Sequence, residues 1–338
     1  MSVGIDIGSK TIKIVELSGD ASSWKLNASG VVGYQGVTPE YAKDETELAA
    51  LAQAIKKLHK EANISSKEVS VALPEPQVFT RTIKFPPLTD QEIASAVKWE
   101  AEQYIPIPIA EAIVQHQVIE RRESATPPEV VVLLVAAPRK LVEAYVKVLQ
   151  MAGLTTVGVE TELMALTRAL APIDQTVMLV DFGARSTDIA IAKGGQLSFS
   201  RTIPTAGEAF TRAVAQSLGI EMQQAEEYKR AYGLSAAQLE GKIKGALDPV
   251  YMIVIDEMKK AIHFYQSEEK GEVPKSIILS GGTSGMPQGL SLVSKTMGAE
   301  VVIGNPFAKI SVEPSAAKTL APYAPLYAIA VGLALRGV

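Results

Sequence analysis

The sequence predicts an α/β protein built from two related lobes, the first of which carries an inserted subdomain. Three observations lead to this expectation. The chain has 338 residues, 47% of them hydrophobic, which is more than one compact core usually holds. A strand-turn-strand pattern recurs about half the chain apart. Patterns typical of strands also alternate with patterns typical of helices, as in α/β proteins.

Composition excludes several classes of protein. Charged residues make up 21% of the chain and the net charge is −4, which argues against a polybasic surface for nucleic acid or for anionic membrane. The absence of cysteine removes disulfides, thiolate nucleophiles and cysteine zinc sites, and fits a reducing cytosol. The three histidines, His59, His116 and His263, lack the i, i+4 spacing of a helical metal site.

No targeting or membrane-spanning segment is expected. The N-terminus, MSVGID, has neither the basic region nor the apolar region of a signal peptide. The longest apolar stretches, 130–137 and 326–335, fall short of the roughly 18 residues that a membrane span needs. We therefore expect a soluble protein.

The repeat joins two segments that are 175 residues apart. The first reads VGIDIGSKTIKIV at 3–15 and the second VMLVDFGARSTDIAI at 177–191. The alignment places Asp181 on Asp6, Gly183 on Gly8, Arg185 on Lys10, Ser186 on Thr11 and Ile189 on Ile14. A period this long indicates a duplicated lobe, because solenoid repeats recur every 20 to 50 residues or so.

Asp6 stands in an alternating apolar strand, where an unpaired carboxylate is costly. One interpretation is an edge-strand aspartate before an ordinary hairpin turn. The second copy favours another: a Gly-led turn offers backbone N–H groups and a hydroxyl to phosphate oxygens, and the preceding aspartate can hold hydrated Mg²⁺. We therefore predict Asp6 and Asp181 as metal-binding residues.

A third element, SIILSGGTSGMPQGL at 276–290, reads as an apolar strand that runs into a Gly-Gly turn and then a helix. Such a turn lets the backbone approach a ligand closely. It lacks the spacing of a P-loop, and no Rossmann glycine motif follows an early strand. Alone it is a weak signal, so the order of the three elements carries the information.

Helix and strand patterns place these elements in the two lobes. In the first lobe, helices are expected at 44–61, from Thr89 to Pro106 and at 139–152, with a strand pair near 69–85 and strands at 112–120 and 129–136. The block at about 80–155 reads as a β-α-β-β-α insertion. In the second lobe, helices should open at Thr205-x-x-Glu208 and at Asp248-Pro249.

The order of hairpin, second hairpin and Gly-Gly turn resembles the actin-like ATPase superfamily, which includes actin, DnaK-type chaperones, sugar kinases and FtsA. Within it the chain resembles the PilM family of type IV pilus assembly. The segments that carry this likeness are 85–108, 159–170, AEEYKRAYG at 225–233, GNPF at 304–307 and the ending PLYAIAVGLALR. The resemblance covers essentially the whole chain.

The resemblance implies an actin-like fold with two duplicated lobes around a nucleotide cleft. The first lobe would span 1–175, with an FtsA/PilM-type inserted subdomain at about 80–155 and a closing helix at 320–338 that returns to it. The second, nucleotide-binding lobe would span 176–319, with a helical subdomain at about 205–272.

By the same resemblance the chain would bind ATP or ADP with Mg²⁺. The first phosphate loop would contain Gly8, Ser9, Lys10 and Thr11, and the second Gly183, Ala184, Arg185 and Ser186. The adenosine would meet Gly281, Gly282 and Thr283 together with Glu226 and Lys229. Ordinary alternatives stay open: the hydroxyls fit any turn, and Glu226 and Lys229 fit an exposed i, i+3 ion pair.

Whether the chain hydrolyses ATP is left open. Glu162 matches the glutamate that orients the attacking water in related proteins, although an acid near a helix start is favourable in any protein. Arg185 stands where many relatives have a small residue, and Glu160 where they have aspartate. Because turnover depends on placing the water accurately, the sequence predicts binding and leaves hydrolysis undecided.

Three functions are weighed. A PilM-like scaffold, cytoplasmic and peripheral to the inner membrane, would dock the N-terminal cytoplasmic peptide of PilN near 85–108 and meet other pilus assembly proteins. It would bind no nucleic acid, would not insert into the membrane, and oligomerisation is possible.

A sugar kinase would need a polar sugar-binding cluster, which we do not find. FtsA carries a C-terminal amphipathic helix, and the ending LALRGV favours PilM over it.

Overall fold

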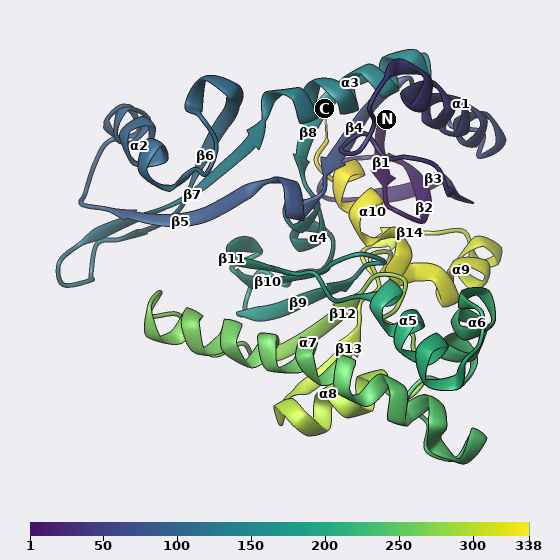
Figure 1. Ribbon diagram of the computed structural model, residues 1–338. Helices are drawn as coiled ribbons and strands as arrows, with labels where there is room; N and C mark the ends of the chain where they lie inside the picture. Colours follow the sequence, from purple (N-terminus) through teal and green to yellow (C-terminus); the bar gives the residue numbers. More distant parts are fainter. Residues whose placement is uncertain (338) are drawn as a thin grey trace. The chain divides into compact units, whose positions relative to one another are not determined.

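The computed structural model describes residues 1–337, which form two units (Figure 1). The first unit contains residues 1–168, the short segment 196–200 and the C-terminal segment from Ile329. The second contains Ala169–Gly195 and Arg201–Ala328. Val338, the last residue of the predicted closing segment 320–338, lies outside the described residues.

The main sheet of the first unit has the strand order β3-β2-β1-β4-β8. Its strands are β1 (Ser2–Ile7), β2 (Thr11–Ser18), β3 (Trp24–Gly33), β4 (Glu68–Leu73) and β8 (Thr155–Thr161). The first three form antiparallel pairs, whereas β1, β4 and β8 run parallel. Since β1 lies between β2 and β4, Asp6 is not on an edge strand, and that interpretation of the aspartate is wrong.

Two helices, α1 (Glu45–Glu61) and α3 (Arg139–Met151), lie side by side in the first unit (Figure 1). The predicted helix at 44–61 is confirmed: Asp44 is its N-cap and accepts hydrogen bonds from two backbone N–H groups, which leaves fewer unpaired donors at the helix start. The buried side chains of both helices share one core with β1 and β4. The sequence pattern places α3 in the insertion, but its apolar face, including Tyr145, belongs to this core.

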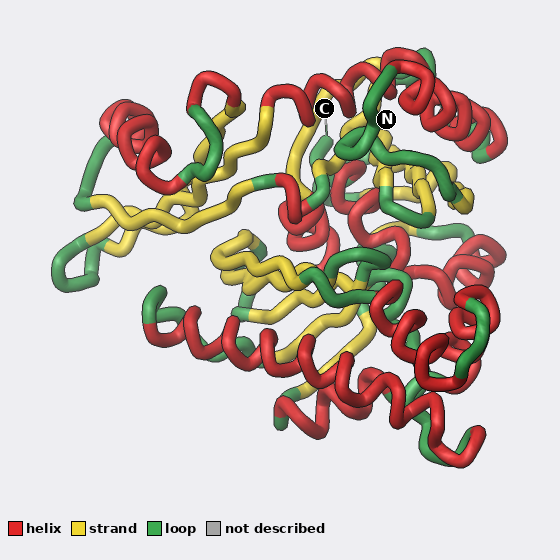
Figure 2. Tube along the Cα trace, in the orientation of Figure 1, coloured by secondary structure: helices red, strands yellow, loops and turns green. Residues whose placement is uncertain are grey.

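The insertion is a three-stranded antiparallel sheet, ordered β5-β7-β6, with one helix on it (Figures 1 and 2). Its elements are β5 (Phe79–Phe85), α2 (Asp90–Tyr104), β6 (Ala112–Arg122) and β7 (Glu129–Pro138). The predicted capping box is present, because Thr89 and Glu92 exchange hydrogen bonds at the start of α2. The predicted strand pair near 69–85 is wrong, since β4 and β5 join different sheets.

The sheet with the strand order β11-β10-β9-β12-β13 belongs to the second unit, apart from residues 196–200 of β11. The strands are β9 (Val177–Phe182), β10 (Thr187–Lys193), β11 (Gln196–Ile203), β12 (Ser276–Ser280) and β13 (Glu300–Ile303). β9 pairs with β10 antiparallel and with β12 parallel. The remaining strand and helices are β14 (Ile310–Ser311), α5 (Gly207–Leu218), α6 (Met222–Tyr232), α7 (Lys242–Ser267), α8 (Gly289–Met297) and α9 (Pro314–Leu320).

Two predicted helix starts in this unit are wrong. α5 begins at Gly207 after Ala206 as N-cap, so Thr205 and Glu208 form no capping box. α7 begins at Lys242, which places Pro249 inside it. Burial of Ile243 and Leu247 favours this early start and outweighs the hydrogen bond that proline cannot donate.

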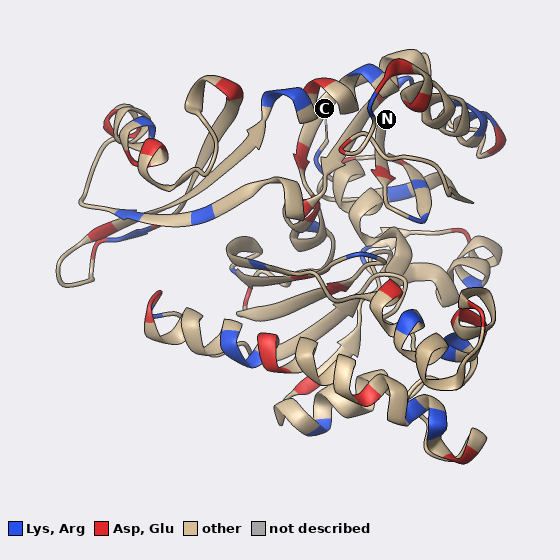
Figure 3. Ribbon diagram, viewed as in Figure 1, with Lys and Arg blue, Asp and Glu red and all other residues tan. Residues whose placement is uncertain are grey.

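Asp248 pairs along α7 with Lys244 instead of capping a helix start. Basic residues lie near both ends of α7, and its acidic residues lie between them (Figure 3). Residues 1–337 also contain four 3-10 helices, at Glu75–Gln77, Ile109–Glu111, Leu239–Gly241 and Ala321–Tyr327. No helix within residues 1–337 combines the length and the apolar character that a membrane crossing requires.

The C-terminal segment returns to the first unit as α10 (Ala328–Ala334). This helix lies against α4 (Glu162–Leu170) and β1. The closing helix predicted at 320–338 is divided, because two prolines lie in the preceding 3-10 helix. Gly4 and Gly332 permit the contact. A Cβ on Gly4 would lie 2.0 Å from the Ala330 carbonyl oxygen, and one on Gly332 would lie 1.9 Å from the Ala165 carbonyl oxygen.

Gly332→Ala should therefore lower the free energy of unfolding by about 2 kcal/mol or more, because backbone atoms would have to move apart. Gly33→Ala is the matched control, since a Cβ at Gly33 meets nothing within 4 Å. Urea denaturation followed by circular dichroism measures both. Equal stability of the two variants would contradict the close approach of α10.

Candidate nucleotide-binding half-sites

The first half-site is the hairpin of β1 and β2. Its turn is closed by a 3.1 Å hydrogen bond from the Gly8 N–H to the Thr11 carbonyl. The Tyr34 N–H donates to the Lys10 carbonyl at 2.9 Å and so holds the turn from the side of β3. The hairpin pattern in the sequence is local, which is why the turn forms where it was expected.

A buried ion pair lies directly below this turn. Asp6 and Lys13 are opposite each other in the strand register, and the Lys13 Nζ lies 2.9 Å from the Asp6 Oδ2. The two residues are only 3% and 8% exposed. A Cβ on Gly8 would lie 3.2 Å from the Lys13 Nζ, so the ammonium reaches the turn itself.

The turn also carries unused hydrogen-bonding groups. Among residues 1–337, neither the backbone N–H nor the hydroxyl of Ser9 has a hydrogen-bond partner, and the Thr11 hydroxyl has none. Ser9 and Thr11 are partly exposed, and Lys10 is exposed. Donors of this kind beside a buried ammonium are suited to an anionic ligand.

The second half-site is the hairpin of β9 and β10. The Gly183 N–H donates to the Ser186 carbonyl at 3.1 Å, and a Cβ on Gly183 would lie 2.7 Å from that same oxygen. Only glycine fits there without a shift. The N-terminal N–H groups of α5 then donate to the turn: Gly207 to the Gly183 carbonyl at 3.1 Å and Glu208 to the Ala184 carbonyl at 2.8 Å.

The register of this hairpin places Asp188 opposite Asp181, where the first hairpin has lysine opposite aspartate. Asp188 is almost fully buried. Its two carboxylate oxygens accept hydrogen bonds from Thr202 at 2.6 Å and from Ser186 at 2.7 Å. Burial nevertheless raises the pKa of Asp188 to about 6, against the effect of these two hydrogen bonds.

The Gly-Gly turn after β12 lies against the end of β9. Gly281 has φ +82°, and a Cβ there would lie 2.8 Å from the Asp181 Oδ1. The Thr283 N–H donates to the Phe182 carbonyl at 3.3 Å. A Cβ on Gly207 would lie 2.9 Å from the Thr283 Oγ1, so both turns meet at the start of α5.

Glu226 and Lys229 belong to a partly buried network, which differs from the exposed pair weighed from the sequence. Lys229 is 5% exposed, and its Nζ donates to Glu226 at 2.6 Å, to the Thr211 hydroxyl at 2.9 Å and to the Gly207 carbonyl at 3.0 Å. Burial alone would raise the pKa of Glu226, but hydrogen bonds from Lys229, Thr211 and Arg230 lower it to about 2. Burial lowers the pKa of Lys229, although its hydrogen bond to Glu226 acts in the opposite direction.

Glu162 begins α4, in the first unit. Its Oε2 accepts a hydrogen bond from the Glu75 N–H at 3.1 Å, and the Glu75 Oε1 accepts one from the Leu163 N–H at 2.7 Å. This reciprocal arrangement is a helix cap supplied by a distant residue. Burial and then Glu40, Glu162 and Asp6 raise the pKa of Tyr145, so Glu162 and Asp6 act on the same hydroxyl.

The sequence-predicted residues thus fall into two sets. The first hairpin holds Asp6, Gly8, Ser9, Lys10 and Thr11, with Glu162 in the same unit. In the second unit, the turn 183–186 and Thr283 both lie close to Gly207 at the start of α5. Lys229 of α6 donates a hydrogen bond to the Gly207 carbonyl. Arg185 is exposed at the turn.

Close backbone approach, free hydroxyls and a reachable ammonium fit a phosphate ligand. Residues 1–337 contain no cluster of three or more His, Cys, Asp or Glu that could hold a metal ion. Mg²⁺ is usually held by one or two carboxylates with water and phosphate oxygens as its other ligands, so single acids such as Asp6 and Asp181 fit that donor set.

Sequence reasoning missed Lys13, Asp188 and Thr211. Lys13 and Asp188 follow their turns by two residues, and the hairpin register alone would have placed each of them opposite the preceding aspartate. Thr211 carries no such signal. Its place between Gly207 and Glu226 results from how α5 and α6 pack.

Comparison with known proteins agrees with this architecture. The family model described as "Type IV pilus assembly protein PilM" matches residues 4–338. A structure of the PilM-PilN type IV pilus biogenesis complex has a TM-score of 0.86 and 30% identity, and the match covers 100% of this chain and 98% of that chain.

The chain is also similar to more distant proteins. FtsA of Enterococcus hirae is 23% identical over 89% of this chain and 77% of its own length. FtsA of Pseudomonas aeruginosa is 27% identical over 48% of this chain and 42% of its own length, so the match spans less than half of that protein. MreB5 of Spiroplasma citri bound to AMPPNP is 14% identical with a TM-score of 0.55, over 98% of this chain and 93% of that one. The chain therefore belongs to the PilM family of type IV pilus assembly proteins and has the actin-like fold.

Proposed function

We propose that this protein binds ATP or ADP with Mg²⁺ at its two hairpin half-sites and serves as a cytoplasmic scaffold of type IV pilus assembly, held at the inner membrane by PilN. The observation that carries the nucleotide part is the duplicated turn, closed by glycine contacts and preceded by an aspartate. Family membership supports the pilus role over a sugar kinase or an FtsA-like division protein.

The residues would divide the work as follows. Ser9, through its N–H and hydroxyl, and Thr11 would donate to phosphate oxygens, while Lys13 would compensate their charge from below the turn. In the second unit, the turn 183–186 and the exposed Arg185 would contact phosphate. Asp6 and Asp181 are the residues that would hold Mg²⁺, and the cation would supply positive charge to offset the phosphates.

The base and sugar would lie at Gly281, Gly282 and Thr283. The two glycines have no side chain, so the ligand could approach their backbone closely. Glu226 and Lys229, which lie on α6, would also contact the base or the sugar. We propose binding as the role of the site and not rapid turnover. The carboxylate of Glu162 is engaged by the Glu75 N–H, which supports a structural part for it at the start of α4.

Asp181→Asn and Asp6→Asn should each weaken Mg-ATP binding by about tenfold or more in calorimetry, since each removes a charge that holds the hydrated cation. With EDTA present the difference from wild type should shrink. Asp174→Asn, at an exposed loop position of the second unit, is the control and should bind normally. Unchanged affinity in both half-site variants, with folding intact, would refute the assignment.

The Glu226 network should give stability that depends on pH. Folding lowers the pKa of Glu226 from 4.5 to about 2, so its ionised form stabilises the fold above about pH 4.5, and this contribution is lost as the pH falls toward 2. Glu226→Gln should therefore cost about 1–2 kcal/mol at pH 7, after allowance for solvent screening, and progressively less in acid.

Thermal melts from pH 7 down to pH 2.5 measure this difference. The neighbouring Glu227→Gln is the control, because Glu227 is exposed and, within residues 1–337, its carboxylate accepts no hydrogen bond from Lys229 or Thr211. A difference between wild type and Glu226→Gln that stays constant across this range would contradict the role of the ionised carboxylate.

The PilN part of the proposal places the peptide on the inserted subdomain near 85–108. Trp99 lies on α2 and is 76% exposed, and exposed tryptophan is typical of interaction surfaces. The chain has two tryptophans, so Trp24→Phe leaves Trp99 as the only indole. Adding the PilN N-terminal cytoplasmic peptide to this variant should shift the fluorescence emission of Trp99. The dissociation constant from this shift should equal the one measured by calorimetry. Calorimetric binding without an emission change would move the peptide to another surface.

A further inference from the structure

A pocket of about 340 Å³ lies within the second unit, away from the half-site residues. It is on the face of the sheet formed by β12 and β13, and the connection that leads into β9 forms its other wall. Nine residues line it: Leu170, Pro172, Gln175, Lys275, Ser276, Ile278, Glu300, Val302 and Lys309. We call it the β13 pocket.

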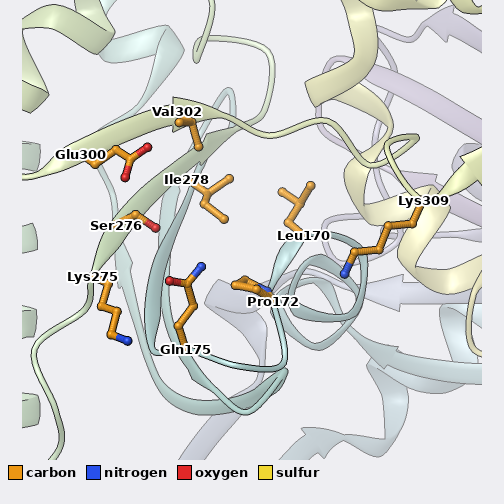
Figure 4. Close-up of a pocket in the computed structure, with 9 residues that line it drawn as sticks. All are labelled: Leu170, Pro172, Gln175, Lys275, Ser276, Ile278, Glu300, Val302 and Lys309. Atoms are coloured by element: carbon orange, nitrogen blue, oxygen red, sulfur yellow. The ribbon is translucent and has the colours of Figure 1, made fainter.

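The floor of the β13 pocket is apolar. Ile278 and Val302 are direct partners in the parallel register of β12 and β13, so their side chains point to the same face. Figure 4 shows both of them, with Leu170, converging on the hollow, and Pro172 beneath. Gly304 seals this floor, since a Cβ there would lie 2.7 Å from Leu170 Cδ1 and 3.2 Å from Ile278 Cγ2.

The rim is polar and chemically unused. Within residues 1–337, none of its five polar side chains makes a hydrogen bond or ion pair: Gln175, Lys275, Ser276, Glu300 and Lys309. In Figure 4 Lys275, Ser276 and Glu300 line one side, where the lysine and the glutamate offset each other, and Lys309 enters from the opposite side. The Lys309 side therefore carries an uncompensated positive charge, although the whole chain has a net charge of −4.

The strand that borders the pocket has an open edge. β13 is the last strand in the sheet order, so the backbone groups on its outer side have no strand partner among the described residues. Val302 is 40% exposed there. An open edge beside an apolar hollow is the geometry by which an extended peptide adds a strand to a sheet, with alternate side chains entering the pocket.

We propose that the β13 pocket binds an extended segment of a partner protein. The segment pairs with the open edge of β13, lays a large apolar side chain over Val302 toward Ile278, and sets an acidic side chain two residues away against Lys309. Spacing by two follows from the strand period, which puts both side chains on one face. The acid follows from the uncompensated charge of Lys309.

This site is independent of the nucleotide proposal and of the inserted subdomain. It uses only residues of the second unit, none of which belongs to either half-site or to 85–108. Variants of the pocket should therefore leave Mg-ATP binding and PilN peptide binding unchanged, which separates a failure of this inference from a failure of the proposed function.

The test uses the full chain and fluorescein-labelled hexapeptides in which Leu, Ile, Met or Phe is followed two positions later by Asp. At least one peptide should bind saturably below about 1 mM in fluorescence anisotropy. Lys309→Glu should weaken it at least tenfold, and a peptide with Lys in place of Asp should recover binding to that variant. Lys295→Glu, on α8 and exposed, is the matched control and should bind like wild type.

Strand addition is tested with N-methylated peptides. Methylating the N–H groups that face β13 should abolish binding, whereas methylating the alternate N–H groups should leave it intact. Three outcomes overturn the proposal: no saturable binding by any peptide, binding that Lys309→Glu and Val302→Asp both leave unchanged, and 4-methylpentanoate competing as strongly as the peptides. The last outcome would indicate a small-molecule site instead.

Discussion

The ammonium of Lys13 is what permits a carboxylate at the buried end of β1. Taking both charges out of water is costly, and the cost is offset only by a short, well-aligned contact, here 2.9 Å between Lys13 Nζ and Asp6 Oδ2. A Cβ on Gly8 would lie 3.1 Å from the Thr11 carbonyl oxygen and 3.2 Å from the Lys13 Nζ, so a larger residue would crowd both the turn and the ammonium. The same turn holds the hydrogen-bond donors of Ser9 and Thr11 at the surface. The first half-site therefore depends on the ion pair below the turn.

The second hairpin meets the same constraint with different chemistry. At the position that corresponds to Lys13 it has Asp188, which faces Asp181 across the strands. Like charges directly opposite each other destabilise a sheet, and the raised pKa of Asp188, about 6, is the consequence of burying it with only the hydroxyls of Ser186 and Thr202 as partners. Its folded pKa exceeds the ordinary 3.8, so this carboxyl costs stability as the pH rises from about 4 to 6. The two hairpins therefore have the same backbone pattern, but the residue opposite the aspartate is basic in the first and acidic in the second.

How much the sequence predicted depended on whether the signal was local. The hairpin turns and the capping box at Thr89 are decided within a few residues, and the structure has them where the pattern placed them. Asp248-Pro249 is also a local signal, yet the helix starts earlier because burial of the preceding turn outweighs it. Lys229 looks like half of a surface pair in sequence, and only the packing of α6 against α5 encloses it.

Two separate apolar cores of the first unit explain how an inserted sheet can coexist with a half-site. Side chains of α2, β5 and β7 form one core, and those of α1, α3, β1 and β4 form another. Because the cores are separate, a change on the outer face of α2 does not have to disturb the packing around Asp6. The two regions are nevertheless joined at Glu75, in the segment that leads from β4 into β5, since this residue exchanges hydrogen bonds with the first two residues of α4. The start of α4, where Glu162 lies, is thus fixed by the same short connection that carries the chain into the inserted sheet.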